Sequence, residues 1–220
     1  MEQIQQIINS ILLPVGIFVL ACVVLGIGWR IFRPRLRGAF GETLLAAVLR
    51  RKLDVSLYHV LNDIYLPIDD GSTTQIDHVV VSPFGVFVIE TKTYKGWIFG
   101  NPRDAQWTQV LHRRKSRFQN PLRQNFLHVQ RLVRLMGLRT DVVHSVVAFS
   151  GEATFKTQLP PEVMHFADVA DYILSFKTEM IPPGDVEGIV AGIVRQDAAI
   201  PASVRKAHVS NLRRRHCQMP

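Results

Sequence analysis

Charged residues are missing from a long stretch near the start of this 220-residue chain. No Asp, Glu, Lys or Arg lies between Glu2 and Arg30, and the residues from Ile11 onward are almost wholly apolar. An apolar run of this length is typical of a membrane span and exceeds an ordinary core helix. A signal peptide is disfavoured, because the basic start that it requires is also missing. The sequence therefore predicts one transmembrane anchor over residues 1–29, with the membrane contacted by residues 7–29.

Lys and Arg are absent before this run and gather directly behind it, at Arg30, Arg33, Arg35 and Arg37. Positive residues beside a span usually stay on the cytoplasmic side of the membrane. We therefore expect a single-pass membrane protein whose C-terminal domain is cytoplasmic. Residues 30–37 are interpreted as a basic juxtamembrane linker, whose arginines also suit anionic lipid headgroups.

Cysteine is scarce, and the two that occur, Cys22 and Cys217, lie near opposite ends of the chain. A framework of intramolecular disulfides is therefore excluded, as expected in a reducing compartment. No pair of His or Cys has the spacing of a zinc site, so His59 and His78 are interpreted as structural. The net charge of +8 indicates a polyanionic partner, either nucleic acid or lipid headgroups.

The rest of the chain predicts one mixed α/β domain over residues 38–200, followed by a flexible basic tail over 201–220. We expect helices over residues 39–52, 120–137, 168–176 and 184–197, and strands over residues 58–66, 75–82, 85–92, 97–100, 106–111, 142–149 and 164–166. On the helix opened by Asn120 and Pro121, we expect an apolar stripe of Leu122, Phe126, Val129, Val133 and Met136. Gln124, His128 and Arg131 share a different face of that helix.

The strands on either side of Pro83–Phe84 have the most informative pattern. Both are rich in β-branched residues and almost continuously apolar, which predicts a central hairpin buried on two sides. A turn at this place sets Asp77 opposite Glu90, with Cβ atoms about 4.5–5.5 Å apart. Lys92 comes two residues after Glu90 and therefore lies on the same face of the strand.

Two opposed carboxylates repel each other unless a positive group lies between them. Mg²⁺ fits such a site, as does Mn²⁺, because one or two carboxylates commonly hold Mg²⁺ together with waters and phosphate oxygens. We expect this metal to activate a water and to stabilise charge on a phosphodiester, with Lys92 assisting either step. The alternative is a salt-bridged strand end, in which Lys92 neutralises Glu90 and Asp77 caps a turn.

Several ordered motifs then resemble one family, the nuclease-related domain (NERD), over about residues 38–149. They are Gly38-Ala-Phe-Gly-Glu42, Gln75-Ile-Asp-His-Val-Val-Val81, Val88-Ile-Glu-Thr-Lys92, Gly96-Trp97 and Asn120-Pro-Leu-Arg-Gln-Asn125. That family is similar to the PD-(D/E)xK nucleases, although Ile76 stands where their pattern has proline. The resemblance implies a restriction-endonuclease-like mixed sheet flanked by helices, with Asp77 and Glu90 as metal ligands and Lys92 as the catalytic lysine. It also implies that Glu42 and Gln124 point into the same site.

These features together predict a membrane-anchored, Mg²⁺-dependent endonuclease that acts on nucleic acid, with DNA expected first. The phosphate contacts are expected from Arg113, Arg114, Lys115, Arg117, Arg123 and Arg131. A solvated loop is the alternative for the basic stretch 112–117. Two other functions stay open: a nucleic-acid-binding module that does not cleave, and a lipid-contacting scaffold that needs no metal.

Overall fold

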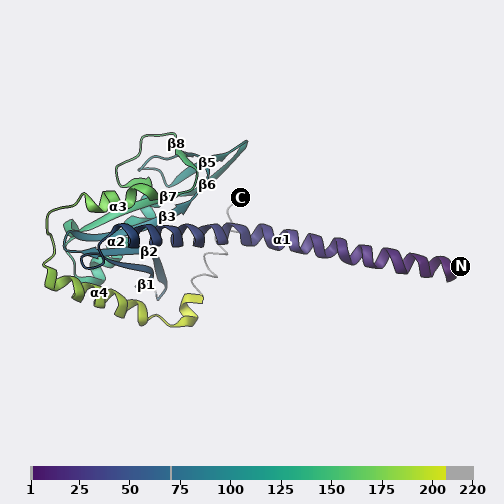
Figure 1. Cartoon of the computed structure of the whole chain (residues 1–220), viewed down its shortest axis with the longest axis horizontal. Helices are drawn as coiled ribbons and strands as arrows, with labels where there is room; N and C mark the ends of the chain where they lie inside the picture. Colours follow the sequence, from purple (N-terminus) through teal and green to yellow (C-terminus); the bar gives the residue numbers. More distant parts are fainter. Residues whose placement is uncertain (1, 70, 207–220) are drawn as a thin grey trace. The chain divides into compact units, whose positions relative to one another are not determined.

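The computed structural model describes residues 2–69 and 71–206, without the side chains of residues 2–14, 16, 29–37 and 39 (Figure 1). The chain divides into two compact units, with the boundary between Phe40 and Gly41. The first unit consists of helix α1 (Glu2–Lys52) as far as Phe40. Within the described residues, no helix is both long enough and apolar enough to cross a lipid bilayer. Many side chains of residues 7–29 are not among those that the structure describes, so the expected span stays a prediction.

Helix α1 differs from the expectation at its middle. Residues 30–37, expected to form a linker, are helical, and the helix expected over residues 39–52 is the last part of α1. Residues 30–37 include Pro34, which is unfavourable inside a helix because it lacks an N–H and its ring crowds the preceding turn. Their sequence alone does not explain why the helix continues through them. The boundary between the two units falls at residue 40 rather than at residue 37.

The second unit is built on a five-stranded mixed sheet in the order β1-β2-β3-β7-β9. β1, β2 and β3 pair antiparallel, whereas β3–β7 and β7–β9 pair parallel. The strands are β1 (His59–Pro67), β2 (Thr73–Ser82), β3 (Gly85–Thr93), β7 (Val143–Ser150) and β9 (Val163–His165). All five were expected from the sequence, within a few residues at their ends.

The central hairpin has the predicted register, with Ser82 opposite Gly85 and His78 opposite Ile89. Alternating side chains place Val80, Phe87 and Ile89 in one apolar cluster and Val79, Val81 and Val88 in another. The hairpin is therefore buried on both faces, as its continuous apolar sequence predicted.

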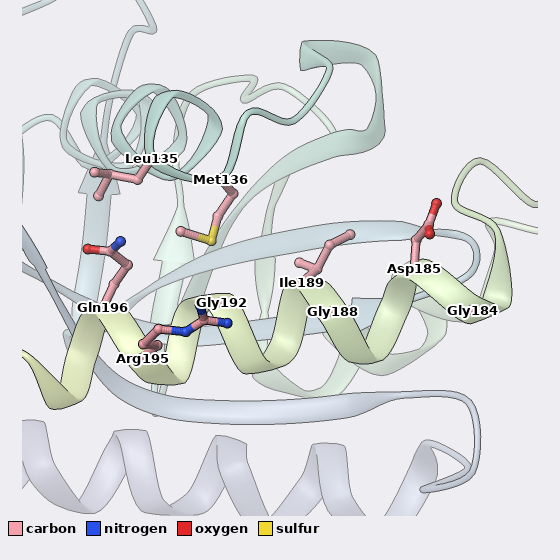
Figure 2. Close-up of a pocket in the computed structure, with 9 residues that line it drawn as sticks. All are labelled: Leu135, Met136, Gly184, Asp185, Gly188, Ile189, Gly192, Arg195 and Gln196. Carbon is pink, nitrogen blue, oxygen red and sulfur yellow. The ribbon is translucent and has the colours of Figure 1, made fainter.

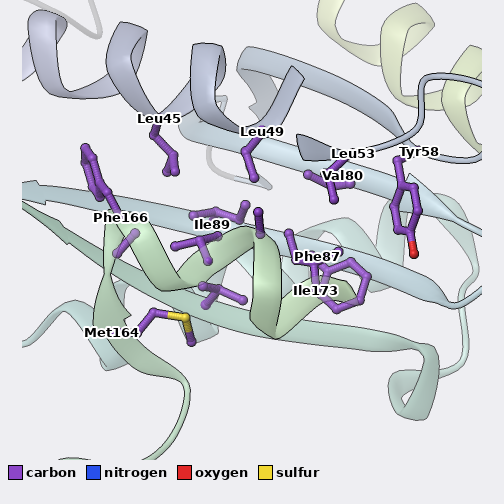
Figure 3. Close-up of a cluster of buried hydrophobic side chains, with 14 residues drawn as sticks. Leu45, Leu49, Leu53, Tyr58, Val80, Phe87, Ile89, Met164, Phe166 and Ile173 are labelled. Carbon is purple, nitrogen blue, oxygen red and sulfur yellow. The ribbon is translucent and has the colours of Figure 1, made fainter. Parts of the chain in front are cut away.

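Helices cover both faces of this sheet and form an α/β mixed-sheet fold. The last turns of α1 and helix α3 (Phe166–Leu174) pack on one face through Leu45, Leu49 and Ile173 (Figure 3). Helices α2 (Pro121–Met136) and α4 (Pro183–Ala198) pack on the other face through Leu132 and Ile193. Figure 1 shows α3 and α4 on opposite sides of the strands. A 3₁₀ turn, η1 (Thr140–Val142), precedes β7.

A second sheet, in the order β6-β5-β4-β8, is inserted between β3 and α2 and completed after β7. Its strands are β4 (Gly96–Phe99), β5 (Gln106–Leu111), β6 (Arg114–Gln119) and β8 (Ala153–Phe155). Ile98, Trp107 and Phe118 pack beneath it against Phe149. β6 and β8 were not expected from the sequence. Most of the basic stretch 112–117, for which a loop was one alternative, is edge strand β6 following a turn.

Helix α2 begins and ends as expected, because the Asn120 side chain accepts a hydrogen bond from the Leu122 N–H and Gly137 takes a left-handed conformation. Its apolar stripe differs from the prediction. Phe126 is 57% exposed, whereas Asn125 is fully buried. The Asn125 amide donates to the carbonyl oxygens of Val88 and Val146, at 2.8 and 3.1 Å, and thereby ties α2 to β3 and β7. The basic run Arg213–Arg215 of the expected tail lies outside the described residues.

Replacing Asn125 with Ala is expected to lower the free energy of unfolding by about 1–3 kcal/mol, because two buried carbonyl oxygens lose a donor. Urea unfolding followed by circular dichroism measures this change. The matched control is Gln130→Ala on the exposed side of the same helix, which should shift stability by less than about 0.5 kcal/mol. Equal stability of the two variants would contradict the assigned role of Asn125.

Candidate functional site

The ladder between β2 and β3 ends next to the predicted site. Its last pair is His78 with Ile89, although β3 stays paired with β7 as far as Thr93. The Asp77 side chain occupies the place of the next backbone partner: its Oδ2 accepts hydrogen bonds from the Thr91 N–H at 2.7 Å and from the Thr91 hydroxyl at 2.6 Å. The expected direct pairing of Asp77 with Glu90 is therefore absent from this ladder. The carboxylate bonds to the residue after Glu90 instead.

Glu90 is the most deeply buried acid of the site, with 3% of its surface exposed. One carboxylate oxygen, Oε1, accepts a hydrogen bond from Lys92 Nζ at 2.5 Å. The other, Oε2, lies 3.3 Å from His128 Nε2 on α2. The second ring nitrogen of His128 lies 2.9 Å from the Thr74 hydroxyl of β2. The predicted shared face of Glu90 and Lys92 is confirmed, and both oxygens of Glu90 have a nitrogen partner.

Gln124 reaches the site from the first turns of α2, as the family resemblance implied. Its Oε1 accepts a hydrogen bond from Lys92 Nζ at 3.0 Å. The ammonium group of Lys92 is thus held between the carboxylate of Glu90 and the amide of Gln124. Asn120 fixes the start of this helix, because its side-chain amide donates to the backbone oxygens of Pro102 and Asp104 while its oxygen caps the helix.

Glu42 comes from the part of α1 that belongs to the second unit. Its half-buried carboxyl has a raised pKa, first because of burial and then because of the negative charges of Asp63 and Glu90, with Lys92 opposing the rise. The neighbouring Gly41 allows this approach, since a Cβ at that position would collide with the Thr93 hydroxyl. The glycine and the acid of the first motif therefore act together in bringing the helix to the site.

The carboxyl groups of the site differ in pKa. Burial and the charge of Glu90 raise the pKa of Asp77 well above its usual range, although the hydrogen bonds from Thr91 lower it. Burial also opposes ionisation of Glu90, but Lys92 and His128 outweigh it and leave the pKa of Glu90 below its usual value. Burial lowers the pKa of Lys92, but the attraction of Glu90 outweighs it and the net pKa is raised. The surroundings of Glu90 and Lys92 thus favour their charged forms, whereas those of Asp77 favour its neutral form.

The residues expected to contact phosphate lie in two places. Arg113, Arg114, Lys115 and Arg117 are exposed in the turn after β5 and along the edge strand β6. Arg123 donates to the Arg103 carbonyl oxygen, and Arg131 donates to the Pro67 carbonyl and to Asp69. The two helix arginines are therefore engaged within the protein, whereas the β6 residues are open to solvent.

His128, Thr91 and Thr74 contact the site but were not among the residues predicted to form it. His128 was identified only as sharing a helix face with Gln124, and that spacing of four residues was the available indication. No sequence pattern pointed to Thr91 or Thr74, because their roles depend on where the β2–β3 ladder stops. Among the described residues, no three or more His, Cys, Asp and Glu side chains converge as a metal-holding group.

A pocket of about 420 Å³ lies elsewhere, between α2 and α4 (Figure 2). Its lining includes Leu135, Met136 and Ile189, together with the charged side chains of Asp185 and Arg195. Gly192 lets the helices approach, since a Cβ there would lie 3.2 Å from Met136 Sδ. None of the site residues described above lines this pocket.

The chain is similar to a bacterial protein over most of its length. An uncharacterized protein of Bacillus anthracis is 34% identical over 183 residues, which cover 81% of this chain and 85% of that protein. Among solved structures, that of Pyrococcus furiosus SfsA in complex with Ca²⁺ matches with 12% identity and a TM-score of 0.27. The match covers 74% of this chain and 54% of SfsA, so the chain spans about half the length of that protein.

The nuclease-related domain family matches residues 37–150, just over half of the chain. This range contains Glu42, Asp77, Glu90, Lys92 and Gln124, and it is consistent with the likeness to PD-(D/E)xK nucleases. The chain therefore belongs to the nuclease-related domain family.

Proposed function

We propose that this protein is a metal-dependent nuclease that hydrolyses phosphodiester bonds of nucleic acid, with DNA as the expected substrate. The observation that carries the proposal is the partly buried ammonium group of Lys92, held at 2.5 Å from Glu90 and 3.0 Å from Gln124, next to the acid Asp77. A lysine that served only to neutralise Glu90 would not need the hydrogen bond to Gln124. The arrangement is instead suited to holding one positive charge in a fixed position at the end of a strand.

The donor set fits Mg²⁺ or Mn²⁺, because one or two carboxylates commonly hold such an ion while phosphate and water oxygens complete its shell. The raised pKa of Asp77 supports this assignment, since a cation beside Asp77 and Glu90 would relieve their repulsion. Asp77 and Glu90 would hold the ion. When bound, it supplies a Lewis acid that lowers the pKa of a coordinated water.

The residues of the chain then have separate roles in the proposal. Lys92 stabilises negative charge that develops on the phosphate, and Gln124 keeps its ammonium group in position. His128 supports Glu90 from the opposite side and limits its movement. Glu42, whose pKa is raised, adds a further carboxyl at the edge of the site.

Membrane attachment through residues 7–29 is part of the same proposal. Large apolar side chains are at least half exposed at Val15, Ile17, Phe18, Val19, Leu20, Val23, Val24, Leu25 and Ile27. Four of them, residues 17–20, are consecutive, so they cover all sides of a helix with 3.6 residues per turn. A helix that is apolar all round suits a lipid environment. The arginines from Arg30 to Arg37 support a cytoplasmic catalytic domain and contact with anionic headgroups.

The first test concerns the metal. A carboxyl group whose pKa is higher in the folded than in the unfolded protein binds its proton more tightly when folded, so ionisation of Asp77 lowers stability as pH rises from its ordinary value through the raised one. Asp77→Asn is therefore expected to raise the melting temperature of the metal-free protein at neutral pH. Mn²⁺ at a hundred times its dissociation constant should stabilise the wild type by about 2.7 kcal/mol and should not stabilise this variant.

Thermal melting in chelator and in Mn²⁺ measures both effects. Glu187→Gln, an exposed acid on α4, is the matched control and should keep the full response to Mn²⁺. An Asp77→Asn protein that Mn²⁺ stabilises as much as the wild type would remove Asp77 from the metal site. If neither Mn²⁺ nor Mg²⁺ changes the melting temperature of the wild type, the salt-bridged strand end is favoured instead of a metal site.

The second test separates cleavage from binding. Lys92→Ala is expected to keep or tighten Mn²⁺ affinity, because it removes a cation beside two acids. It should slow cleavage of plasmid or single-stranded DNA by about 10²- to 10³-fold, the usual cost of losing one group that stabilises developing charge. Calorimetry and a cleavage assay on the same preparations measure the two quantities.

Lys95→Ala serves as control for Lys92→Ala. Lys95 follows Lys92 by three residues and forms an exposed ion pair with Glu152. This control variant should cleave at about the wild-type rate. Cleavage by Lys92→Ala at the wild-type rate would exclude lysine from the mechanism. A wild-type protein that binds metal and nucleic acid without cleaving either substrate would be a binding module instead.

The third test concerns the membrane. Replacing Leu20 and Val24 with Asp should each cost about 2.5–3.5 kcal/mol of insertion free energy and should release the protein from membranes. Fractionation in high salt and in alkaline carbonate measures this release. A wild type that high salt alone releases would be held by headgroup contacts and not by a span.

A further inference from the structure

The second sheet has one buried face and one face open to solvent. Ile98, Trp107 and Phe118 point into the apolar cluster beneath it and are buried. Because successive side chains of a strand point to opposite faces, the residues between them lie on the outer face. The registers of β4, β5 and β6 arrange these outer residues in two rows, Trp97–Val110–Lys115 and Phe99–Thr108–Arg117.

Two aromatic rings are exposed on this outer face. Trp97 is 52% exposed and Phe99 is 37% exposed, and they stand two residues apart on β4. Alternate residues of a strand are separated by about 6.4–6.8 Å, so the rings lie side by side. Lys156, which follows β8, lies over the Trp97 ring with its Nζ 4.8 Å from the ring centroid. The rings thus offer apolar stacking surface in a positively charged setting.

The charges of this face have one sign. Lys115 and Arg117 end the two rows on the edge strand, and Lys156 lies at the other side of Trp97. None of the strands β4, β5, β6 and β8 contains Asp or Glu. Cations suit phosphate groups, and aromatic rings suit bases. The face is therefore complementary to a chain that carries both groups.

A single strand meets these requirements better than a duplex does. In a duplex the bases are stacked on one another and present only their edges in the grooves. In a single strand they are free to stack on protein rings, as they do on other sheets with exposed aromatic residues. Two rings on one strand, flanked by cations, therefore favour single-stranded nucleic acid.

The β4-β5-β6 part of this sheet is connected along the chain to the candidate active site, both before β4 and after β6. Gly96, the first residue of β4, follows Lys92 by only a few residues. It has a φ of +81°, and a Cβ at this position would lie 2.5 Å from the Val110 carbonyl oxygen. Gln119 ends β6, and the next residue caps α2, whose Gln124 contacts Lys92. A nucleic-acid strand bound on this face would thus lie on a sheet that is joined through short connections to Lys92 and Gln124.

We propose that the outer face of the β6-β5-β4-β8 sheet is a stacking platform for single-stranded nucleic acid. Trp97 and Phe99 each receive a base, and Lys115, Arg117 and Lys156 contact the phosphates. This proposal adds a preference for single strands to the proposed nuclease function. The role of the platform in catalysis rests on that function. Binding to the platform requires neither the metal nor cleavage.

The test uses the full-length protein in detergent and in chelator, so that nothing is cleaved. Fluorescence anisotropy measures affinity for a labelled oligothymidine of about 16 nucleotides and for a duplex of the same length. Trp97→Ala and Phe99→Ala are each expected to weaken oligothymidine binding by roughly 5- to 140-fold, the usual effect of losing one stacked base. Duplex affinity should stay within about twofold, because a duplex leaves its bases unavailable for stacking.

Three comparisons make this result specific. Phe126→Ala removes a ring that is 57% exposed on α2, away from the sheet, and should leave both affinities unchanged. Trp97→Phe keeps a stacking ring and should restore most of the affinity. Replacing both Lys115 and Arg117 with Ala should lower the salt dependence of oligothymidine binding by about 0.7 for each lost phosphate contact, whereas Trp97→Ala should not change it.

Oligothymidine affinity unchanged in both Trp97→Ala and Phe99→Ala would overturn the proposal, and a lowered melting temperature in Trp97→Ala without loss of affinity would assign the ring to structure. An equal loss of duplex affinity would also contradict stacking. A wild-type protein that shows the expected affinities but cleaves neither substrate would refute the nuclease function and leave the platform in place.

Discussion

The ion pair between the buried Glu90 and the partly buried Lys92 is the contact on which the rest of the site depends. Taking two charges out of water is costly, and an unpaired partner would be strongly destabilising. The structure offsets this cost with groups from α2, because Gln124 accepts from the ammonium group and His128 lies beside the second carboxylate oxygen. The position of α2 on the sheet is therefore coupled to the charge state of β3. Asn125, between these two residues, extends the coupling to β7 through its buried amide.

The end of the β2–β3 ladder gives the charged groups a place in an otherwise apolar sheet. Beyond His78 and Ile89 the facing edge of β3 no longer needs a backbone partner from β2, and the Asp77 carboxylate satisfies the Thr91 N–H instead. Groups from α1 and from α2 then approach the same strand end from its two faces. The cost is an electrostatic imbalance, visible in the raised pKa values of Asp77 and Glu42. Such imbalance is more typical of functional sites than of structural ion pairs.

Much of the second unit was predictable from the sequence because its causes are local. Two β-branched runs around Pro83–Phe84 indicate a buried hairpin wherever they occur, and Asn120–Pro121 with Gly137 marks the ends of a helix. The outer sheet was only half predicted. β6 has the sequence of a solvated loop, and its extended form depends on pairing with β5 rather than on its own side chains. The expected linker before the domain is helical instead, although Pro34 is unfavourable in a helix interior.

The sequence by itself determined that Glu90 and Lys92 meet, because residues two apart on a strand share a face whatever surrounds them. It also determined the family, since several ordered motifs span residues 37–150. Only the tertiary structure decided the partners of Asp77, because these depend on the residue at which a ladder stops. It also decided that Asn125 points inward and Phe126 outward, against their polarity. The buried Asn125 amide is stable there because it donates to carbonyl oxygens of two strands. These acceptors come from the packed sheet, and the helix sequence does not reveal them.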